Sequence, residues 1–296
     1  LSYLEAILRI YNLLGRRDNK YKARIKILVK ETGLEKFTQL VETEWALIRD
    51  KLEVSDAHFA AMKAHFTPFD YDKNAAQDVT FAAHTQENNA FATWIKYNTQ
   101  AHKVDGYRIV FLSLKAPDSP PGDLTSEQLD AIAELAVKYS FGEIRSTHRQ
   151  NFVFADVKQA DLFTLWQALA AQKLVTPNIG MATDIICCPG LDFCSLANAG
   201  SIGITQDIND VLDNVDYLHD IGDVNINISG CMNGCAHQSV GHIGILGVDK
   251  KGVEWYQFTL GGSSSNEAAI GERLGPAIPK SDVAQAVETI LNVYVQ

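Results

Sequence analysis

The first part of the chain shows apolar residues with the spacing of an α-helix. Four of them fall on one predicted helical face: Leu4, Ile7, Leu8 and Tyr11. A second periodic stretch runs from residue 25 to residue 48 and is interrupted at Gly33. Because a repeat near 3.6 residues places side chains on one side of a helix, residues 1–66 are predicted to be mainly helical.

The next part of the chain is polar and irregular. Neither a helical nor an alternating apolar repeat is visible from about residue 68 to residue 89. Such a stretch is typical of a loop that connects or wraps domains. We therefore expect residues 67–104 to form a linker.

Residues 105–175 show strand and helix patterns in alternation. Tyr107–Lys115 is rich in β-branched and aromatic residues, and Glu143–Ala155 is a second strand region of this kind. Between them, Thr125 is followed three residues later by Gln128, which is the pattern of a capping box at a helix start. A second helix is predicted after the second strand. This order indicates a small α+β domain with its helices on one face of the sheet.

Residues 176–296 are rich in glycine and predict a second α+β domain. Three segments in this part are expected to be strands: Asn225–Ser229, His242–Leu246 and Glu254–Leu260. A closing helix is predicted over Ser281–Val293, with Ser281 as its N-cap. The fold class predicted for the whole chain is therefore α+β.

The composition is that of an ordinary globular protein. Hydrophobic residues make up 46% of the chain and charged residues 21%, close to the usual proportions. No run of 18 apolar residues occurs, so no membrane span is predicted. No signal segment is visible either. Because the chain begins with Leu1 and stops abruptly at Gln296, we expect it to be a fragment of a longer protein.

The charge of the chain is unevenly distributed. The formal net charge is −10, yet residues 16–30 contain seven lysines and arginines and a single acid, Asp18. One short basic stretch in an acidic protein argues against general nucleic-acid binding, which needs many phosphate contacts. The stretch is either a solvated helix face or a site for a ligand with several negative charges.

The five cysteines all lie between residues 187 and 235, in two closely spaced groups. An odd number of cysteines without a secretion signal argues against a disulfide framework and indicates a reducing compartment, so the protein is expected to be cytoplasmic. Cys188 and Cys194 form a C-x5-C pair, and Cys231 and Cys235 form a C-x3-C pair. Four thiolates are what a cubane cluster needs, one per iron. Zinc fits less well, because its structural sites use tighter pairs.

Two residues next to or within these pairs are interpreted separately: Cys187 and Asn233. Cys188 is followed by proline, as cluster ligands often are, so its neighbour Cys187 is interpreted as a buried structural thiol. Asn233 lies between the two cysteines of the C-x3-C pair. It is either a turn residue that tolerates unusual backbone angles or a residue that contacts a cofactor.

The residues around the cysteines resemble a known family. Cys-Pro-Gly-Leu-Asp-Phe-Cys at 188–194 and Asn-Ile-Ser-Gly-Cys-Met-Asn-Gly-Cys-Ala-His at 227–237 resemble the sirohaem-dependent sulfite and nitrite reductases. Arg-Ser-Thr-His-Arg-Gln at 145–150 resembles the Arg-x-Thr-x-Arg-Gln signature of that family. Tyr11–Phe37 resembles the basic segment that joins its two pseudo-symmetric halves. Within the family the likeness is to the C-terminal half of the assimilatory sulfite reductase haemoproteins.

The resemblance implies a fold, two cofactors and a reaction. Residues 105–175 are similar to a ferredoxin-like half-domain, and residues 176–296 to a domain that binds a [4Fe–4S] cluster and sirohaem. The implied reaction is the six-electron reduction of sulfite to sulfide in assimilatory sulfur metabolism. Residues 1–66 would complete the preceding half of the protein, and that N-terminal half is an implied partner.

The resemblance also implies roles for individual residues. Cys188, Cys194, Cys231 and Cys235 would bind the cluster, and the Cys235 sulfur would also bind the sirohaem iron and pass electrons to it. Asn233 would lie against both cofactors. The basic residues that would contact the sirohaem carboxylates are Arg17, Lys20, Lys22, Arg24 and Lys26.

The sequence leaves the roles of several arginines and histidines open. Arg145 and Arg149 are interpreted as interface residues with carboxylate partners, and no role is assigned to the three histidines near the motifs: His148, His237 and His242. The family's substrate-binding arginines and lysines lie chiefly in its N-terminal half. We therefore expect residues 1–296 alone to hold no stable sirohaem and to show no methyl-viologen-driven sulfite reduction.

Three alternative functions remain compatible with the sequence. The same cofactors would support nitrite reduction to ammonia. An electron-transfer iron–sulfur module would hold the cluster without sirohaem, and a zinc-stabilised domain would hold one colourless metal ion. Both a ferredoxin and a flavoprotein subunit are compatible electron donors.

Overall fold

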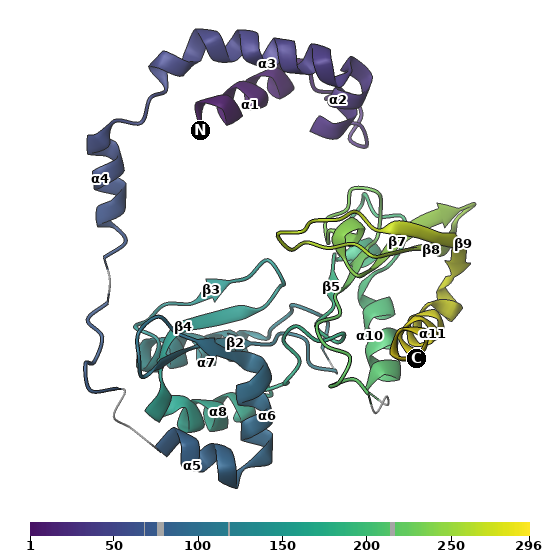
Figure 1. The fold of residues 1–296 in the computed structure, drawn as a ribbon. Helices are drawn as coiled ribbons and strands as arrows, with labels where there is room; N and C mark the ends of the chain where they lie inside the picture. The colour runs from purple at the N-terminus through teal and green to yellow at the C-terminus, as the bar shows by residue number, and fades with distance from the viewer. Residues whose placement is uncertain (68, 76–79, 118, 214–216) are drawn as a thin grey trace. The chain divides into compact units, whose positions relative to one another are not determined.

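The computed structural model describes residues 1–296 except for residues 68, 76–79, 118 and 214–216. The chain divides into two compact units, Leu1–Asp70 and Tyr71–Gln296 (Figure 1). Among the described residues, no helix is both long enough and apolar enough to cross a membrane.

The first unit is helical, as the apolar repeat predicts. Its α-helices are α1 (Ser2–Leu14), α2 (Ile25–Thr32), α3 (Leu34–Ile48) and α4 (Asp56–Ala64). A short 3-10 turn, Arg49–Lys51, follows α3. Gly33 separates α2 from α3 with a φ of 84°, a conformation that glycine adopts without steric cost. The interruption seen in the sequence is therefore a sharp turn between two helices.

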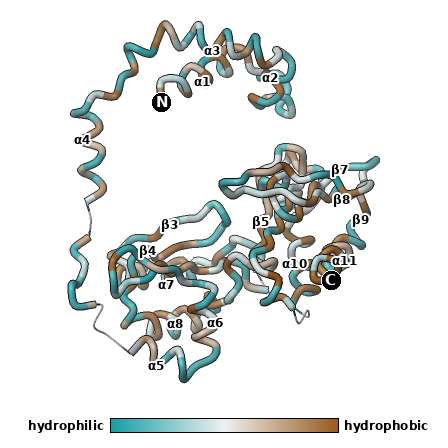
Figure 2. Tube along the Cα trace, in the orientation of Figure 1, coloured by the Kyte–Doolittle hydropathy of each residue, from teal (hydrophilic) through white to brown (hydrophobic). Residues whose placement is uncertain are grey.

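The core of the first unit comes from the facing sides of α1, α2 and α3. Its buried apolar residues are Ala6, Ile10, Leu28, Phe37, Val41 and Ile48. Figure 2 shows hydrophobic and hydrophilic positions alternating along these helices. Burial of one apolar side of each helix against the others is what stabilises such short helices in water.

The second unit begins with a four-stranded antiparallel sheet in the order β1-β2-β4-β3. Its strands are β1 (Thr99–Ala101), β2 (Tyr107–Leu112), β3 (Arg145–Ser146) and β4 (Phe152–Lys158). Its helices are α5 (Thr80–Glu87), α6 (Asn89–Asn98), α7 (Ser126–Tyr139) and α8 (Leu162–Ala171). The helices lie on one face of this sheet (Figure 1), as expected.

The expectation of a linker over 67–104 is wrong for residues 80–101. This part of the chain forms α5, α6 and β1. Phe91 and Trp94 on α6 are 0% and 1% exposed and belong to the core that lies under the sheet. The sequence signal failed because the apolar residues of α6 follow a long polar stretch. Residues 68 and 76–79 of the expected linker lie outside the described part of the chain.

The start of α7 carries the predicted capping box. The Thr125 hydroxyl accepts a hydrogen bond from the Gln128 backbone N–H at 3.2 Å, and the Gln128 side chain accepts one from the Thr125 N–H at 3.0 Å. Two N–H groups that a helix start leaves unpaired are thereby satisfied.

A second sheet has five strands in the order β5-β6-β7-β8-β9. The strands are β5 (Ile186–Cys187), β6 (Ile226–Ser229), β7 (Ile243–Lys250), β8 (Val253–Leu260) and β9 (Glu272–Pro279). The β5-β6 and β6-β7 pairs are parallel, and the β7-β8 and β8-β9 pairs are antiparallel. Helices α10 (Ile202–Leu212) and α11 (Val283–Val295) pack against each other and contribute to the core of this sheet.

The closing helix differs from its prediction at its first turn. Helix α11 begins at Val283 with Asp282 at the N-cap position, and no side chain caps it. Ser281 lies in a preceding 3-10 turn and donates a hydrogen bond to the Asp282 carboxylate at 2.7 Å. The prediction of Ser281 as the cap is therefore wrong.

A buried carboxylate, Asp156, ties the start of the second unit to its first sheet. The Tyr71 hydroxyl donates a hydrogen bond to Asp156 at 2.6 Å, and the His102 ring nitrogen Nε2 lies 3.2 Å from the same oxygen. The His102 Nδ1 atom accepts a hydrogen bond from the Val104 N–H. Burial and the neighbouring Asp156 raise the pKa of Tyr71 to about 12.

This contact predicts a loss of stability at alkaline pH. The native state holds Tyr71 protonated above the ordinary pKa of tyrosine. The contribution of the protonated Tyr71 to the free energy of unfolding is therefore complete below about pH 10. It is lost as the pH rises towards about 12. We expect the urea midpoint of the complete protein to fall over this range, with a shallower fall in Tyr71→Phe. Equal slopes in both proteins would contradict the assignment.

Candidate metal centre

The two cysteine pairs lie on loops that leave neighbouring strands at the same edge of the second sheet. Strands β5 and β6 are parallel, with Cys187 opposite Ile228. Cys188 follows the last residue of β5, and Cys231 comes two residues after the last residue of β6. Carboxyl ends of adjacent parallel strands meet at one edge of a sheet, where binding sites commonly form. The topology therefore brings together two motifs that are 36 residues apart.

Hydrogen bonds to the second loop hold Cys188 in place. Its backbone N–H donates to the Ile228 carbonyl at 3.1 Å, and its Sγ atom accepts from the Gly230 N–H at 3.1 Å. The Ser201 hydroxyl lies 3.4 Å from the same sulfur. An N–H group aimed at a thiolate stabilises its negative charge, and such bonds tune the potential of iron–sulfur clusters.

Cys194 is positioned by a single turn of helix, α9 (Gly190–Phe193). Its N–H donates to the Gly190 carbonyl at 2.9 Å, and its own carbonyl accepts from Ala197 at 3.1 Å. The side chain is half-buried. Thus four of the five residues between Cys188 and Cys194 form a helical turn, and this turn sets the C-x5-C spacing.

The C-x3-C loop is held by side chains of β6. The Ala236 N–H donates to the Ser229 hydroxyl at 3.2 Å, and the Asn227 amide donates to the Ala236 carbonyl at 2.8 Å. Within the loop, the Gly234 N–H donates to the Cys231 carbonyl at 3.2 Å. Cys231 is 8% exposed, whereas Cys235 is exposed.

Two glycines allow the cysteine loops to touch each other. A Cβ atom on Gly190 would lie 2.6 Å from the Ser201 backbone nitrogen, and one on Gly230 would lie 2.5 Å from the Ala199 carbonyl oxygen. The Gly230 position would also be 3.1 Å from the Gly190 Cα atom. Only glycine fits at both points without displacing backbone. The two cysteine loops therefore approach each other closely at these two residues.

The donor set fits a cubane cluster better than a single metal ion. Among the described residues, no three His, Cys, Asp or Glu side chains lie close enough to bind one metal ion together. Tetrahedral zinc with thiolates at about 2.3 Å would need sulfur atoms within about 4 Å of one another. In a cubane each thiolate binds a different iron, so the sulfurs stand farther apart. The four thiols on two loops that touch at Gly190 and Gly230 would supply one ligand for each iron of a cubane.

Cys187 has the structural role that the sequence suggested. It is 3% exposed, and its side chain belongs to the hydrophobic core of the second sheet. Burial raises the pKa of its thiol to about 11. A thiol of this kind stays protonated at neutral pH and is a poor metal ligand.

The basic residues expected to contact sirohaem lie in the first unit, between α1 and the first turn of α2. All five are exposed: Arg17, Lys20, Lys22, Arg24 and Lys26. Arg17 lies over the Tyr11 ring, 4.8 Å from its centroid, and Lys20 lies over the Tyr21 ring at 5.2 Å. Because these residues and the cysteines belong to different units, their part in the site stays a prediction. Asn233 is half-buried inside the C-x3-C loop.

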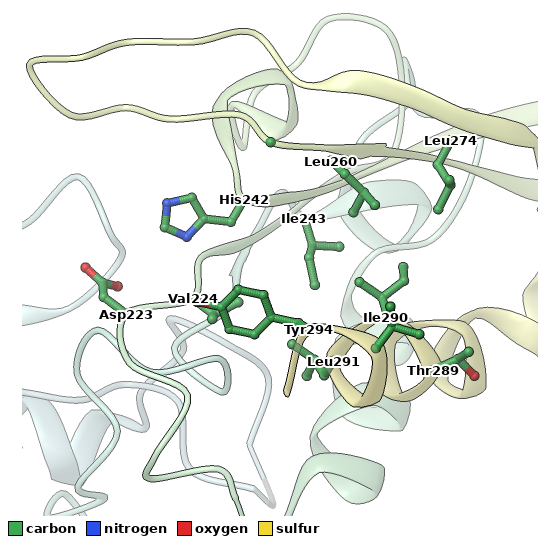
Figure 3. A pocket seen from close by; sticks show the side chains of 12 residues that line it. Asp223, Val224, His242, Ile243, Leu260, Leu274, Thr289, Ile290, Leu291 and Tyr294 are labelled. Carbon is green, nitrogen blue, oxygen red and sulfur yellow. The ribbon is translucent and has the colours of Figure 1, made fainter. Parts of the chain in front are cut away.

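The three histidines near the motifs differ in exposure and in their contacts. His148 and His237 are exposed. His242 accepts a hydrogen bond from the Asn225 N–H at 3.1 Å and lines an apolar pocket of about 640 Å³ between the second sheet and α11 (Figure 3). The other residues around this pocket include Leu260, Ile290 and Tyr294. His242 therefore has a local structural partner.

The two arginines of the 145–150 motif have carboxylate neighbours. Arg145 pairs with Glu143 in the same turn region. Arg149 lies 3.9 Å from Asp223, which comes shortly before strand β6 of the second sheet. Of these two arginines, Arg149 alone pairs with a carboxylate in the part of the unit that holds the second sheet, so the interface interpretation fits Arg149 and is wrong for the partner of Arg145.

Sequence reasoning missed a buried polar network beside the first cysteine loop. The Lys115 ammonium donates to the Asp184 carboxylate at 2.6 Å, and both side chains are 0% exposed. The Gln150 amide forms hydrogen bonds with the backbone of Cys187. A signal was available, since Lys115 ends the apolar segment Tyr107–Lys115 and Gln150 is the last residue of the Arg-x-Thr-x-Arg-Gln motif.

Comparison with known families agrees with this arrangement. Residues 104–172 match the nitrite/sulfite reductase ferredoxin-like half domain. Residues 1–48 and 182–296 match the nitrite and sulphite reductase 4Fe-4S domain, which covers both cysteine loops. The chain belongs to the nitrite and sulfite reductase family. Members of this family bind sirohaem and a [4Fe–4S] cluster. The resemblance and the predicted fold class are confirmed.

The relatives include enzymes named for either anion. An assimilatory ferredoxin-dependent nitrite reductase of Haloferax mediterranei is 26% identical over 98% of this chain and 46% of its own length. The Synechococcus elongatus ferredoxin–nitrite reductase is 26% identical over 97% of the chain and 49% of its own length. Sulfite reductase [ferredoxin] 2 of Mycolicibacterium paratuberculosis is 26% identical over 98% and 47%. The chain spans about half the length of these relatives.

A solved structure supports the fold of this nitrite and sulfite reductase family chain. The Mycobacterium tuberculosis NirA protein superposes with a TM-score of 0.63 at 23% identity, over 98% of this chain and 48% of that one. A dissimilatory sulfite reductase superposes with a TM-score of 0.52 at 13% identity over 64% of this chain. At such low identity the likeness shows the fold alone.

Proposed function

We propose that the protein to which this chain belongs reduces sulfite to sulfide with six electrons, in assimilatory sulfur metabolism. The observation that carries the proposal is the pair of cysteine loops at the carboxyl ends of β5 and β6, which approach each other at Gly190 and Gly230. The 4Fe-4S family match over 182–296 supports it. The narrower choice of sulfite rests on the resemblance of the cysteine motifs.

In this proposal the four cysteines have unequal roles. Cys188, Cys194 and Cys231 would anchor the cluster, and the exposed Cys235 would hold both the cluster and sirohaem. The bound cofactors supply single-electron transfer and an iron atom that binds the anion. Exposure of Cys235 supports its role, because a sulfur shared with a second cofactor needs an open side.

The proposal also gives roles in cofactor binding to the basic segment of the first unit and to Asn233. The basic segment from Arg17 to Lys26 would neutralise the carboxylates of sirohaem. Asn233, inside the C-x3-C loop, would lie against both cofactors. An N-terminal half of the same protein would supply the residues that bind sulfite, so residues 1–296 alone are expected to be inactive.

The electron donor and location are part of the same proposal. The names of several relatives specify ferredoxin, which supports a ferredoxin as donor, with a flavoprotein subunit as the alternative. Cysteine usage supports a cytoplasmic location. No nucleic-acid or membrane partner is proposed.

Metal and spectral analysis of the complete protein tests the cofactors. We expect about four irons and four acid-labile sulfides per cluster, one further iron in sirohaem, no stoichiometric zinc, and sharp haem-like absorption bands. Broad absorbance near about 400 nm without sharp bands would indicate an electron-transfer iron–sulfur module instead. A colourless protein with one zinc ion per chain would overturn the proposal.

Nitrite reduction to ammonia is the second candidate, because the relatives from Haloferax mediterranei and Synechococcus elongatus are named nitrite reductases. The chemistry requires six electrons in both cases. Steady-state kinetics of the complete protein with each anion decides between them. We expect kcat/KM for sulfite to exceed that for nitrite, and the reverse order would assign the protein to nitrite reduction.

A further inference from the structure

The turn that carries Gln150 is rigidly built. The Thr147 hydroxyl accepts hydrogen bonds from the Arg149 N–H at 3.2 Å and the Asn151 N–H at 3.1 Å. The Thr147 N–H donates to the Asn151 carbonyl at 2.9 Å, and Gln150 adopts a φ of 60°. Residues other than glycine rarely adopt this left-handed conformation. The turn thus holds the Gln150 backbone in one conformation.

The turn is also anchored to the segment that leads into the first cysteine loop. The Lys115 ammonium donates to the Arg149 carbonyl at 2.7 Å and to the Asp184 carboxylate at 2.6 Å. The Asn151 amide donates to the same Asp184 oxygen at 2.9 Å. Asp184 lies only four residues before Cys188. The ferredoxin-like half-domain is therefore joined to the cluster domain by buried polar contacts.

The Gln150 amide satisfies both backbone groups of Cys187. Its nitrogen donates to the Cys187 carbonyl at 2.7 Å, and its oxygen accepts from the Cys187 N–H at 3.1 Å. One side chain thus forms the pair of bonds that a neighbouring strand would form. The next residue, Cys188, is bound from the other side by Ile228 and Gly230.

We propose that Gln150 is a positioning residue for the cluster: through the backbone of Cys187 it sets the place of the Cys188 sulfur. This inference rests on the proposed function for the cluster itself. It goes beyond that function because it makes the ferredoxin-like half-domain part of the cluster's support. The side chain acts on the cluster through Cys188.

The test uses the complete protein and two variants of similar size. Gln150→Met keeps the length of the side chain and removes both hydrogen bonds. Gln150→Glu keeps the acceptor but places a carboxylate against the Cys187 carbonyl. The control is Gln167→Glu, because Gln167 is exposed on α8 of the same half-domain. Circular dichroism and thermal melting confirm that each variant is folded.

The main measurement is the alkylation rate of each cysteine after the cluster has been extracted with a chelator. Peptide mass spectrometry assigns the rates. Loss of two hydrogen bonds is expected to raise the Cys188 rate by about tenfold, relative to Cys194, Cys231 and Cys235 in the same molecule. Gln167→Glu should leave the ratio unchanged. An unchanged ratio in Gln150→Met, or an equal rise at all four cysteines, would overturn the proposal.

The second measurement is the midpoint potential of the cluster in the intact holoprotein. We expect it to shift in both Gln150 variants and to stay at the wild-type value in Gln167→Glu, since hydrogen bonding and solvent exposure around the sulfurs set this potential. Wild-type potentials in both Gln150 variants would count against the proposal. A wild-type protein without iron and sulfide would instead overturn the proposed function, whereas the alkylation ratios would still report on Gln150.

Discussion

Replacing Cys235 by serine is expected to remove the [4Fe–4S] cluster and the sirohaem together from the complete protein. Cys235 is the exposed member of the four thiols and ends the C-x3-C pair. If its sulfur binds an iron of the cluster and the iron of sirohaem, neither cofactor is held without it. Activity should fall by more than about a hundredfold, because even outer partners of metal ligands contribute about 10- to 100-fold. Iron, sulfide and visible spectra measure the loss.

The chain offers a matched control for this experiment in Cys187. Its thiol is buried in the core, so Cys187→Ala should keep both cofactors and lose only packing energy. A Cys235→Ser protein that loses the cluster and retains sirohaem would contradict the bridge. Loss of both cofactors from Cys187→Ala would contradict the assignment of the spare thiol.

Replacing Lys115 by methionine is expected to destabilise the protein by about 3–5 kcal/mol, the usual result of breaking a buried ion pair. The Asp184 carboxylate would stay buried at 0% exposure without its cation. It would keep the hydrogen bonds from Asn151 and the Gly180 N–H. Those neutral donors do not replace a full positive charge. Urea-induced unfolding of the complete protein measures the change.

An exposed ion pair in the same unit provides the comparison for this variant. Lys158 and Asp72 are 2.9 Å apart with side chains 40% and 42% exposed. Lys158→Met should therefore cost at most about 1 kcal/mol. In the double variant Lys115→Met with Asp184→Leu, part of the lost stability should return, since no buried charge is left unpaired. A Lys115→Met protein as stable as Lys158→Met would show that the pair contributes little.

Local patterns in the sequence predicted the structural features that depend on residues close together in the chain. The interrupted repeat over 25–48 became α2 and α3 on either side of Gly33, and Thr125 with Gln128 became a capping box. Both depend on residues within one or two helical turns. The prediction of a linker was wrong for α6, because Phe91 and Trp94 are buried in a core that forms only with strands distant in the sequence.

Taken alone, the sequence determined the chemistry of the site. Cysteine type and spacing on each loop are local properties, and they indicated a cubane and a family that the comparisons confirm. Tertiary structure decided what supports the site: the parallel pairing of β5 with β6, the contact of Gly190 with Gly230, and the bonds from Lys115 and Gln150. These contacts join residues more than 30 positions apart, and their partners are selected by strand pairing and burial, which no local pattern specifies.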